Sequence, residues 1–580
     1  MTRWLPFASG GISILTTLTL IARDYPFIGH DYRYFIPRLI DTDLHLRLNG
    51  PWIQWYTPSF GSGIPAFPNP QHLQYSLVQA LTYISNPWIA VLATTAIALA
   101  IGFWACYRIA RTHLGLGVTA ATLAGLFFIG NGFTIGHAIV GHVSFQLFPL
   151  TALMLWTLLD RRMGHLARGA LLGLTMALTL YHGGAIVMIV GAMAMALCLP
   201  LLVALRPPLF DWRGWGATLT VAVSFSAAIT APKIVAGLML IEQFPRHVSV
   251  DPAVPLTRAL AGLVSQIAGV QTIAPLLAAV GVDPSRAYGV MVRLGGTPRL
   301  GLWELDTGLS PILFVCLAIG GWMMWRRRQT TSGTSLQPVQ RRALALLALG
   351  AWIVIEATLD HGLIFPLIKA LPVMNTLHVA SRFGAVLILP LALLGGVGVD
   401  RWLSGRRSIG PLLVLATCAM PLTYFVLPGS LHVRTFNVAS SIRDAETLRL
   451  ADRGVTRLAP VTDAEALSVG ASSLLPYDPL FGYGNESFSP ETRAGDVRVV
   501  TDGYWNMTNP ASLVFPHENG LRRFERIREA DRERLEQFLQ RRQPDWVLPA
   551  SVVWSTRIAA PALILCAAAI ASGFWKRARS

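Results

Sequence analysis

Residues 4–31 read WLPFASGGISILTTLTLIARDYPFIGHD, an apolar run followed by a short polar stretch that ends on Asp31. The apolar part is long enough to cross a bilayer, because roughly 20 such residues span the hydrocarbon core as a helix. The next residues are Ile21-Ala22-Arg23-Asp24, which do not resemble a signal-peptidase site. We therefore expect a membrane anchor here, with Asp31 just beyond the lipid boundary.

The composition is that of a membrane protein. The chain is 53% hydrophobic and 13% charged, whereas a soluble domain usually carries about 25% charged residues. We count about twelve apolar runs, near residues 4–22, 87–106, 116–135, 145–160, 167–186, 187–205, 215–235, 308–325, 343–358, 381–399, 410–428 and 555–574. The predicted fold class is mainly α, a polytopic membrane protein with about twelve transmembrane helices and a C-terminal extracytoplasmic α/β domain.

Basic residues predict the orientation of the chain. Short cytoplasmic loops carry an excess of Lys and Arg, and such residues cluster here between alternate apolar runs, for example at Arg161/Arg162 and at Arg406/Arg407. Both termini are then cytoplasmic, in a multi-pass protein that we place in a bacterial inner membrane. This bias explains most of the net charge of +16, so no nucleic-acid partner is expected.

Four regions follow from this pattern. They are a first transmembrane module (1–240) with a long outer loop (23–86), a second module (241–428) with an outer loop (242–306), a polar outer domain (429–553), and a last transmembrane helix with a basic tail (554–580).

The outer domain has the pattern of a mixed α/β fold. We predict strands at 496–501 and 546–548, and an amphipathic helix near 521–543. All five cysteines lie in or beside apolar runs, so neither a disulfide framework nor a Cys/His zinc spacing is indicated.

The first outer loop holds the leading candidate for chemistry. Loops this long without evident structure are usually functional, and Asp31 is placed to act on something that the membrane presents. By contrast, Asp41 and Asp43 have the pattern of solvated charges. Aromatic rings that stack on sugars, and amides that bond to hydroxyls, are supplied by Tyr32, Trp52, Trp55, Asn69 and Gln71. The alternative for the aromatic residues is an interfacial belt.

Four histidines are expected near the same interface: His30, His137, His142 and His182. Their spacings match no metal-ligand motif. Hydrogen-bonding roles beside the reaction centre and roles in packing or capping are both open.

Ionisable residues at membrane depth are usually functional. Lys233 and Arg382 lie where two apolar runs meet the outer boundary, and a lipid-linked phosphate is the natural counter-charge; snorkelling to the interface is the alternative. Glu304 and Asp306 could supply a second carboxylate or a metal ligand, or be solvated loop-end charges. The loop around Arg293 and Arg299 has the composition of a segment that closes over a phosphate.

The order of these motifs resembles the GT-C superfamily of membrane glycosyltransferases. The residues that carry the resemblance are His30-Asp31 after the first span, and Trp52, Pro58, Gly61, Gly63, Pro65 and Asn69-Pro70-Gln71 in the long loop. Within the superfamily the chain is most similar to the bacterial YfhO-like family, through Pro232-Lys233, Trp303-Glu304, the segment 371–383 and Tyr477-Asp478-Pro479.

The resemblance implies transfer of a sugar from a polyprenyl-phosphate donor, such as one on undecaprenyl phosphate, to an acceptor on the outer face. The acceptor class (envelope glycan, lipid or protein) is left open. It also implies that Asp31 is the catalytic carboxylate, a base for the acceptor hydroxyl, with His30 beside it. Lys233 and Arg382 are then candidates for the phosphate of the sugar donor. Some members of the superfamily use a divalent cation such as Mg²⁺ or Mn²⁺.

Two other classes of function fit the same residues. A transporter or flippase of a lipid-linked sugar would also use basic and aromatic side chains, although the inverted repeats common in transporters are not visible. A non-enzymatic envelope assembly protein would use the outer domain to hold a partner.

Overall fold

The computed structural model describes residues 4–244, 255–295, 300–330, 336–370, 379–403, 408–451, 454–478, 480 and 491–579. The chain is mainly helical, as predicted. Within the described residues, nine helices are long and apolar enough to cross a membrane: Pro87–His113, Val118–Val140, Ala185–Leu205, Trp212–Gln243, Thr257–Ala279, Pro338–Leu359, Ala380–Leu403, Ile409–Val426 and Ala550–Trp575. Shorter apolar helices lie at Leu5–Ile21, Val143–Leu159 and Pro311–Met323.

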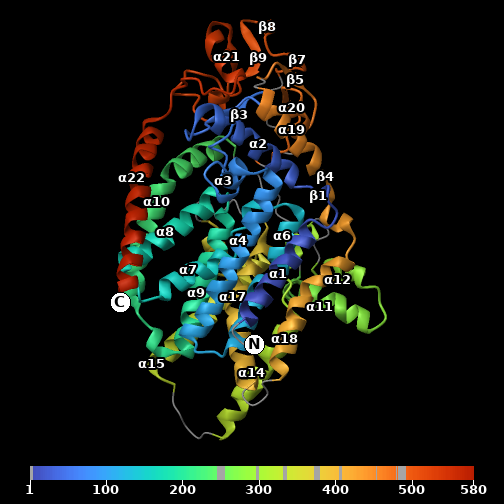
Figure 1. The fold of residues 1–580 in the computed structure, drawn as a ribbon, viewed down its shortest axis with the longest axis vertical. Coiled ribbons are helices and arrows are strands. Elements are labelled where there is room, and N and C mark those ends of the chain that lie inside the picture. The colour runs from blue at the N-terminus through green and yellow to red at the C-terminus, as the bar shows by residue number, and fades with distance from the viewer. Residues whose placement is uncertain are drawn as a thin grey trace.

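These helices form one elongated bundle (Figure 1). Its elements are α1 (Leu5–Ile21), α4 (Pro87–Arg108), α5 (Val118–Ile129), α6 (Gly132–Val140), α7 (Leu150–Leu159), α8 (His165–Tyr181), α9 (Ala185–Leu205), α10 (Trp212–Gln243), α14 (Pro311–Thr330), α15 (Pro338–Leu359), α17 (Ile388–Leu403), α18 (Ile409–Ala419) and α22 (Ala550–Arg579). The C-terminal helix α22 packs along α8 and α10, and α17 packs against both α5 and α14.

Asparagine caps define where two of the apolar helices begin. The Asn86 side chain accepts a hydrogen bond from Ile89 N at 2.9 Å at the start of α4. The Asn131 side chain accepts one from Thr134 N at 2.8 Å, so the run predicted as one span at 116–135 is divided into α5 and α6. An Asn at this position satisfies one of the backbone N–H groups that every helix start leaves free.

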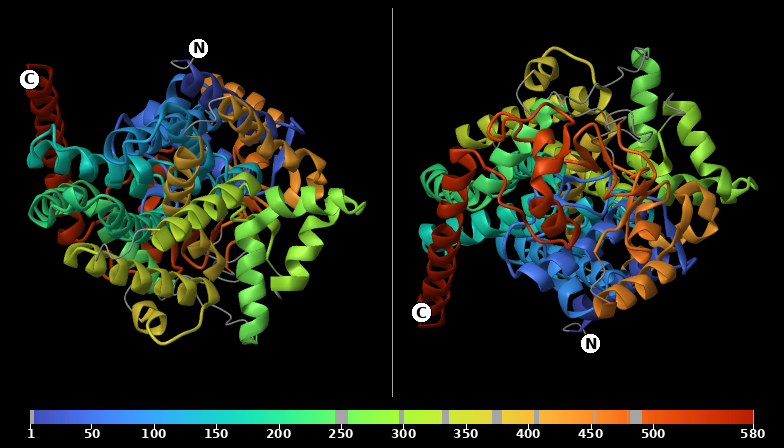
Figure 2. Two further views of the ribbon diagram at one scale, coloured as in Figure 1. Left: turned by 90° about the horizontal axis from the view of Figure 1, so that it is seen from below. Right: turned by 90° about the horizontal axis from the view of Figure 1, so that it is seen from above.

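The segment 242–306, predicted as an outer loop, contains helices that the sequence analysis missed. They are α11 (Leu256–Ala279), which is interrupted at Gly269 with φ 58°, and α12 (Ala287–Gly295). Polar residues break the apolar pattern of α11, but they are bonded inside the protein; Gln266 Nε2 donates to Thr307 Oγ1 at 3.1 Å. Figure 2 shows α11 and α12 at the periphery of the bundle.

Together, the first loop and the outer domain form four small sheets. β4 (Arg434–Asn437) pairs antiparallel with β1 (Phe27–Gly29) of the first loop, and β2 (Tyr56–Thr57) pairs with β3 (Ile64–Pro65) within that loop. One three-stranded sheet has the order β6 (Ala471–Ser473), β5 (Arg457–Ala459), β7 (Gly495–Asp496), and the other β10 (Arg526–Arg528), β9 (Tyr504–Thr508), β8 (Val500–Thr501). The helices beside them are α2 (Tyr32–Asn49), α3 (Leu77–Ile84), α19 (Val438–Ala451), α20 (Asp463–Ser468) and α21 (Arg532–Leu539).

The secondary structure predicted for this domain is partly wrong. The amphipathic helix expected near 521–543 is shortened to α21, because β10 occupies the first part of that segment. The strand expected at 546–548 is absent; these residues form no regular element. The run at 496–501 is divided between the end of β7 and β8.

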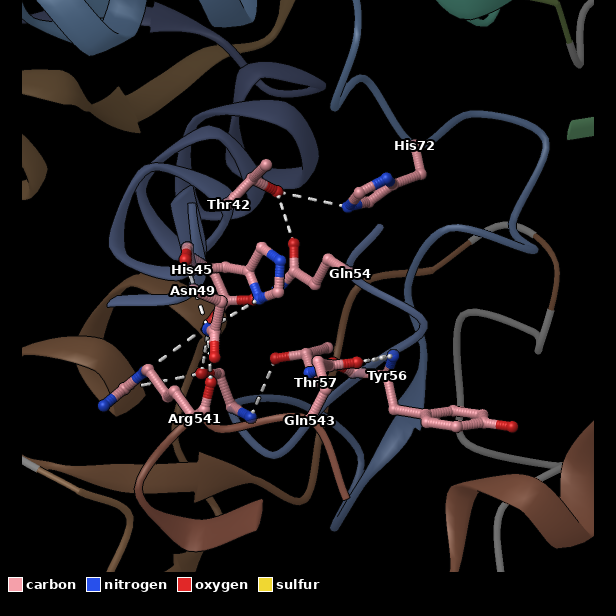
Figure 3. Close-up of polar contacts among 11 residues, drawn as sticks. Thr42, His45, Asn49, Gln54, Tyr56, Thr57, His72, Arg541 and Gln543 are labelled. Carbon is pink, nitrogen blue, oxygen red and sulfur yellow. Dashed lines mark hydrogen bonds and ion pairs between the residues drawn. The ribbon is translucent and has the colours of Figure 1, made fainter. Parts of the chain in front are cut away.

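The first loop and the outer domain form one interlocked unit that covers one end of the bundle (Figures 1 and 2). Arg38 of α2 donates to Asp463 at 2.9 Å and to Asp478 at 3.1 Å. Asn49 Nδ2 donates to Arg541 O at 2.9 Å, and Gln543 bonds the backbone of Tyr56 (Figure 3). Buried charge pairs and amide contacts therefore join segments that lie more than 400 residues apart.

Two carboxylates of α2 are buried rather than solvated, contrary to the prediction. Asp41 and Asp43 are 3% and 1% exposed. Asp41 accepts hydrogen bonds from Gln54, at 2.7 Å, and from Ser59, and Asp43 accepts one from Arg47 at 3.0 Å. Their charge alone suggested that both side chains are exposed to solvent. The folded first loop instead supplies the hydrogen-bond donors that these buried carboxylates need.

Candidate functional site

Asp31 lies at the junction between the bundle and the outer unit. It follows β1 and precedes α2, and its backbone N–H donates to Val140 O at the end of α6, at 3.1 Å. Gly29 permits this approach, because a Cβ there would collide with the carbonyl oxygens of Ile139 and Val140. Gly141, with φ +104°, turns the chain after α6 directly beside Tyr32. The two glycines hold the Asp31 segment against the end of α6.

Three side chains contact the Asp31 carboxylate. Oδ1 lies 2.9 Å from His30 Nε2 and accepts a hydrogen bond from the Tyr477 hydroxyl at 2.9 Å. Oδ2 lies 2.5 Å from His142 Nε2. His30 and His142, which the sequence places near the same interface with their roles open, therefore both contact this carboxylate. Sequence reasoning assigns no role to Tyr477, which is 446 residues away along the chain.

Electrostatics keep this carboxylate ionised. Burial by itself would raise the pKa of Asp31, but the charge and hydrogen bond of His142, with a smaller contribution from His30, hold that pKa well below its usual range. The side chain is 14% exposed, so it is mostly buried but can still be reached by a ligand. Asp31 is thus a preformed, negatively charged hydrogen-bond acceptor.

A second charged cluster combines Arg382, Glu304 and His137. Arg382 Nε donates to Glu304 Oε2 at 2.8 Å, and Nη2 donates to Oε1, which makes a two-pronged pair. His137 Nε2 lies 3.7 Å from Glu304 Oε2. Glu304 belongs to α13 (Leu302–Leu305) and Arg382 to the 3-10 segment η6 (Ala380–Leu387).

Aromatic contacts join the two clusters. The rings of His137 and His142 lie 5.0 Å apart between centroids. The Trp303 ring lies 5.6 Å from that of His30 and 6.2 Å from that of His142. The structure therefore brings together six of the predicted site residues: His30, Asp31, His137, His142, Glu304 and Arg382.

Lys233, the other predicted phosphate ligand, lies under the first loop. Its ammonium donates to the backbone oxygens of Phe67 at 2.9 Å, Asn69 at 2.7 Å and His72 at 3.1 Å. An ammonium has three N–H donors, and all three are used in holding the loop.

Of the predicted acceptor or sugar contacts, His142 contacts Asp31, whereas the aromatic and amide residues of the first loop have other surroundings. Tyr32 is buried and donates to Ala138 O at 2.5 Å. Asn69 is buried and donates to Asp478 at 3.2 Å, and its own side-chain oxygen accepts from the Gln71 backbone at 3.0 Å. Trp52 is 75% exposed. Trp55 packs edge-on against Phe67 with centroids 5.5 Å apart.

His182 and Asp306 have separate surroundings. His182 is fully buried and lies 3.2 Å from the Gln146 side-chain oxygen. Asp306 does not join Glu304; it accepts from the Tyr424 hydroxyl at 2.5 Å.

A divalent cation, which the resemblance allows, fits the donor set poorly. Within the described residues, ligand atoms of His137, His142 and Glu304 lie within 4.8 Å of one another, and His137 Nε2 has no hydrogen-bond partner. However, Arg382 holds both oxygens of Glu304. Imidazoles are also poor ligands for Mg²⁺, which prefers oxygen. A guanidinium occupies the place where a metal would have to bind the carboxylate.

A cavity of about 630 Å³ opens beside Asp31. Its wall includes His30, which contacts Asp31, and Tyr477, which donates to it. Asp31 itself does not line the cavity; His30 and Tyr477 lie between the carboxylate and the cavity.

Comparison with known proteins gives limited matches. No family model and no curated protein matches the chain. The solved structure of the arabinofuranosyltransferase AftD from Mycobacteria is similar over 83% of this chain and 32% of its own, at 16% identity and a TM-score of 0.44. ArnT from Cupriavidus metallidurans, solved bound to undecaprenyl phosphate, is similar over 70% of this chain and 80% of its own, at 14% identity and a TM-score of 0.35.

The chain spans about a third of the length of the AftD chain that it matches. At this level of similarity the neighbours assign no function to it. The mainly helical fold of membrane type, with small sheets, is confirmed by the structure itself, whereas the narrower assignment to the YfhO-like family stays a prediction.

Proposed function

We propose that this protein is an integral-membrane glycosyltransferase. It transfers a sugar from a polyprenyl-phosphate donor to an acceptor hydroxyl at the extracytoplasmic face of a bacterial inner membrane. One observation carries the proposal: Asp31 is ionised and oriented by His30, His142 and Tyr477, and two of these residues, His30 and Tyr477, line a cavity of the outer unit.

The hydrogen bonds of Asp31 indicate which oxygen acts as the base. A carboxylate oxygen accepts about two hydrogen bonds. Oδ1 already has two partners, His30 and Tyr477, whereas Oδ2 has only His142. We therefore assign Oδ2 as the atom that accepts the proton of the acceptor hydroxyl.

The transfer is then a single displacement. The acceptor oxygen attacks the anomeric carbon as its proton passes to Asp31, the bond between that carbon and the phosphate oxygen breaks, and polyprenyl phosphate leaves with the electron pair. Because His142 and His30 keep the pKa of Asp31 low, the carboxylate is ionised before the acceptor binds and can accept a hydrogen bond from its hydroxyl; the transferred proton then passes to water.

The leaving phosphate needs a cation beside it. Arg382 is the predicted phosphate ligand that lies in the site, and the Glu304 carboxylate fixes the direction of its guanidinium. Burial alone would raise the pKa of Glu304, but Arg382 and His137 hold that pKa well below its usual range, so the pair is ionic. For Lys233 we propose a positioning role in the loop, since a phosphate could bind it only if it left three carbonyl oxygens.

Mass spectrometry of cells with and without the gene tests this function. We expect one polyprenyl-phosphate sugar to accumulate in the absence of the gene and one envelope glycan to lose the corresponding residue. If the protein were a flippase, cells without the gene would instead keep the lipid-linked sugar on the cytoplasmic side of the membrane. Protection of that sugar from an impermeant glycosidase would reveal this outcome. An assembly protein would change neither the lipid-linked sugar nor the composition of the glycan.

A further inference from the structure

The cavity beside Asp31 has walls from the outer unit alone. Its residues belong to the first loop, with His30 and Arg33, to β4, with Thr435, and to the outer domain around Thr462 and Tyr477. Of the residues that line it, none belongs to a candidate membrane span. A polyprenyl tail needs an apolar path along the bundle, so the cavity suits a water-soluble ligand.

Arg33 gives this cavity a positive charge. The side chain is exposed, and its guanidinium carbon lies 3.6 Å from the centroid of the Tyr477 ring. Among the described residues no carboxylate forms an ion pair with it. Arginine stacked on an aromatic ring keeps its N–H groups at the rim of the plane, where they can bind an anion with two hydrogen bonds.

The carboxylate in the same wall is already paired with another arginine. Asp463 lines the cavity, but it is buried and pairs with Arg38 at 2.9 Å. Arg38 lies on the same helix as Arg33 and also pairs with Asp478 at 3.1 Å. Arg38 is therefore structural, and Arg33 is the cavity cation whose charge is available to a ligand.

Two residues that line the cavity, Tyr477 and His30, also contact Asp31. Tyr477 contacts Arg33 with its ring and donates its hydroxyl to Asp31. His30 lines the cavity and also contacts Asp31. An anion held by Arg33 would thus lie one side chain, that of Tyr477, away from Asp31.

We propose that this cavity binds the acceptor, and that the acceptor is an acidic glycan whose carboxylate or phosphate is held by Arg33. This inference rests on the proposed function, since it assigns the second substrate of the same site. The volume of about 630 Å³ lies in the range of about 300–1,000 Å³ that is usual for small-molecule sites. Thr435 offers a hydroxyl to the other oxygens of a sugar.

Binding measurements on the full-length protein in detergent test the proposal without turnover. The probes are a disaccharide that contains glucuronic acid, its carboxyl-reduced neutral counterpart, and undecaprenyl phosphate. We expect the wild type to bind the acidic disaccharide about tenfold more tightly than the neutral one, which is about 1.4 kcal/mol. Arg33→Met should abolish this preference and leave the affinity for undecaprenyl phosphate unchanged, whereas Arg33→Lys should retain part of the preference.

Arg523→Met is the matched control, because Arg523 is also exposed and lies 4.6 Å from an aromatic centroid, that of Phe244, outside the cavity. It should bind both disaccharides like the wild type. Equal affinity of the wild type for the acidic and neutral disaccharides would overturn the proposal. Loss of undecaprenyl-phosphate binding in Arg33→Met would also overturn it, by assigning the cation to the sugar donor.

The failure of the proposed function would look different. If Asp31→Asn kept full transfer, Asp31 would not be the base, yet the charge preference of the cavity would stand. If the charge preference were absent, the transfer reaction could still take place with a neutral acceptor.

Discussion

Asp31 receives its three contacts from three parts of the chain: the adjacent His30, His142 after α6, and Tyr477 of the outer domain. Each contact needs a different piece of the fold to be in place. The three contacts are therefore complete only when the outer domain is docked on the bundle. In this arrangement the Asp31 carboxylate and the outer domain form one site.

Asp306 differs from Asp31, because its pKa is raised rather than lowered, and this difference gives a testable prediction. Burial raises its pKa to about 7, partly offset by the hydrogen bond from Tyr424. The unfolded chain releases this proton near about pH 4, so the contribution of Asp306 to stability falls as the pH rises from about 4 to about 7. We expect the Tm of the wild type, relative to that of Asp306→Asn, to fall between about pH 5 and about pH 8. A Tm difference that stayed constant over this range would contradict the prediction.

At the scale of elements, α2 connects the first loop to the outer domain. Arg38 is buried between Asp463 and Asp478, and the same helix begins at Tyr32, directly after Asp31. Movement of the outer domain away from α2 would separate Tyr477 from Asp31. The ion pairs of Arg38 therefore support the site from a distance.

Removing Arg38 tests this link. Arg38→Met leaves two buried carboxylates without their cation, and breaking a buried pair in this way costs about 3–5 kcal/mol. Denaturant unfolding in detergent, monitored by tryptophan fluorescence, should show that the free energy of unfolding falls by this amount. Arg498→Met is the control, since Arg498 pairs with Glu536 at the surface and exposed pairs contribute at most about 1 kcal/mol. Equal effects of the two substitutions would contradict a docking role for Arg38.

At the scale of the whole molecule, both termini lie toward the end of the bundle away from the outer domain (Figure 1). The positive-inside pattern predicts that this end is cytoplasmic. All five native cysteines are buried, so one introduced cysteine reports its own side of the membrane. We expect an impermeant maleimide to label Glu529→Cys from outside intact spheroplasts and Arg341→Cys only after lysis. The reverse labelling would invert the orientation and place Asp31 on the cytoplasmic side.

The sequence was sufficient for the membrane fold and for the local part of the site. Long apolar runs marked most of the helices, and the motif Gly29-His30-Asp31 identified the carboxylate. The span in α11 was missed, because Gln266 and Gln271 interrupt its pattern and find partners only in the folded bundle. The roles of Tyr477 and Lys233 were missed for the same reason: their contacts join segments far apart in the chain.

The most direct test of the central claim is the transfer rate of Asp31→Asn in purified protein, measured together with its affinity for the lipid-linked sugar. Asn is close in size to Asp but cannot accept a proton as a base, and general-base catalysis typically contributes about 10²–10⁴-fold. We predict a loss of transfer of that order with the affinity for the sugar donor retained. Full transfer by Asp31→Asn would contradict the assignment of Asp31 as the base.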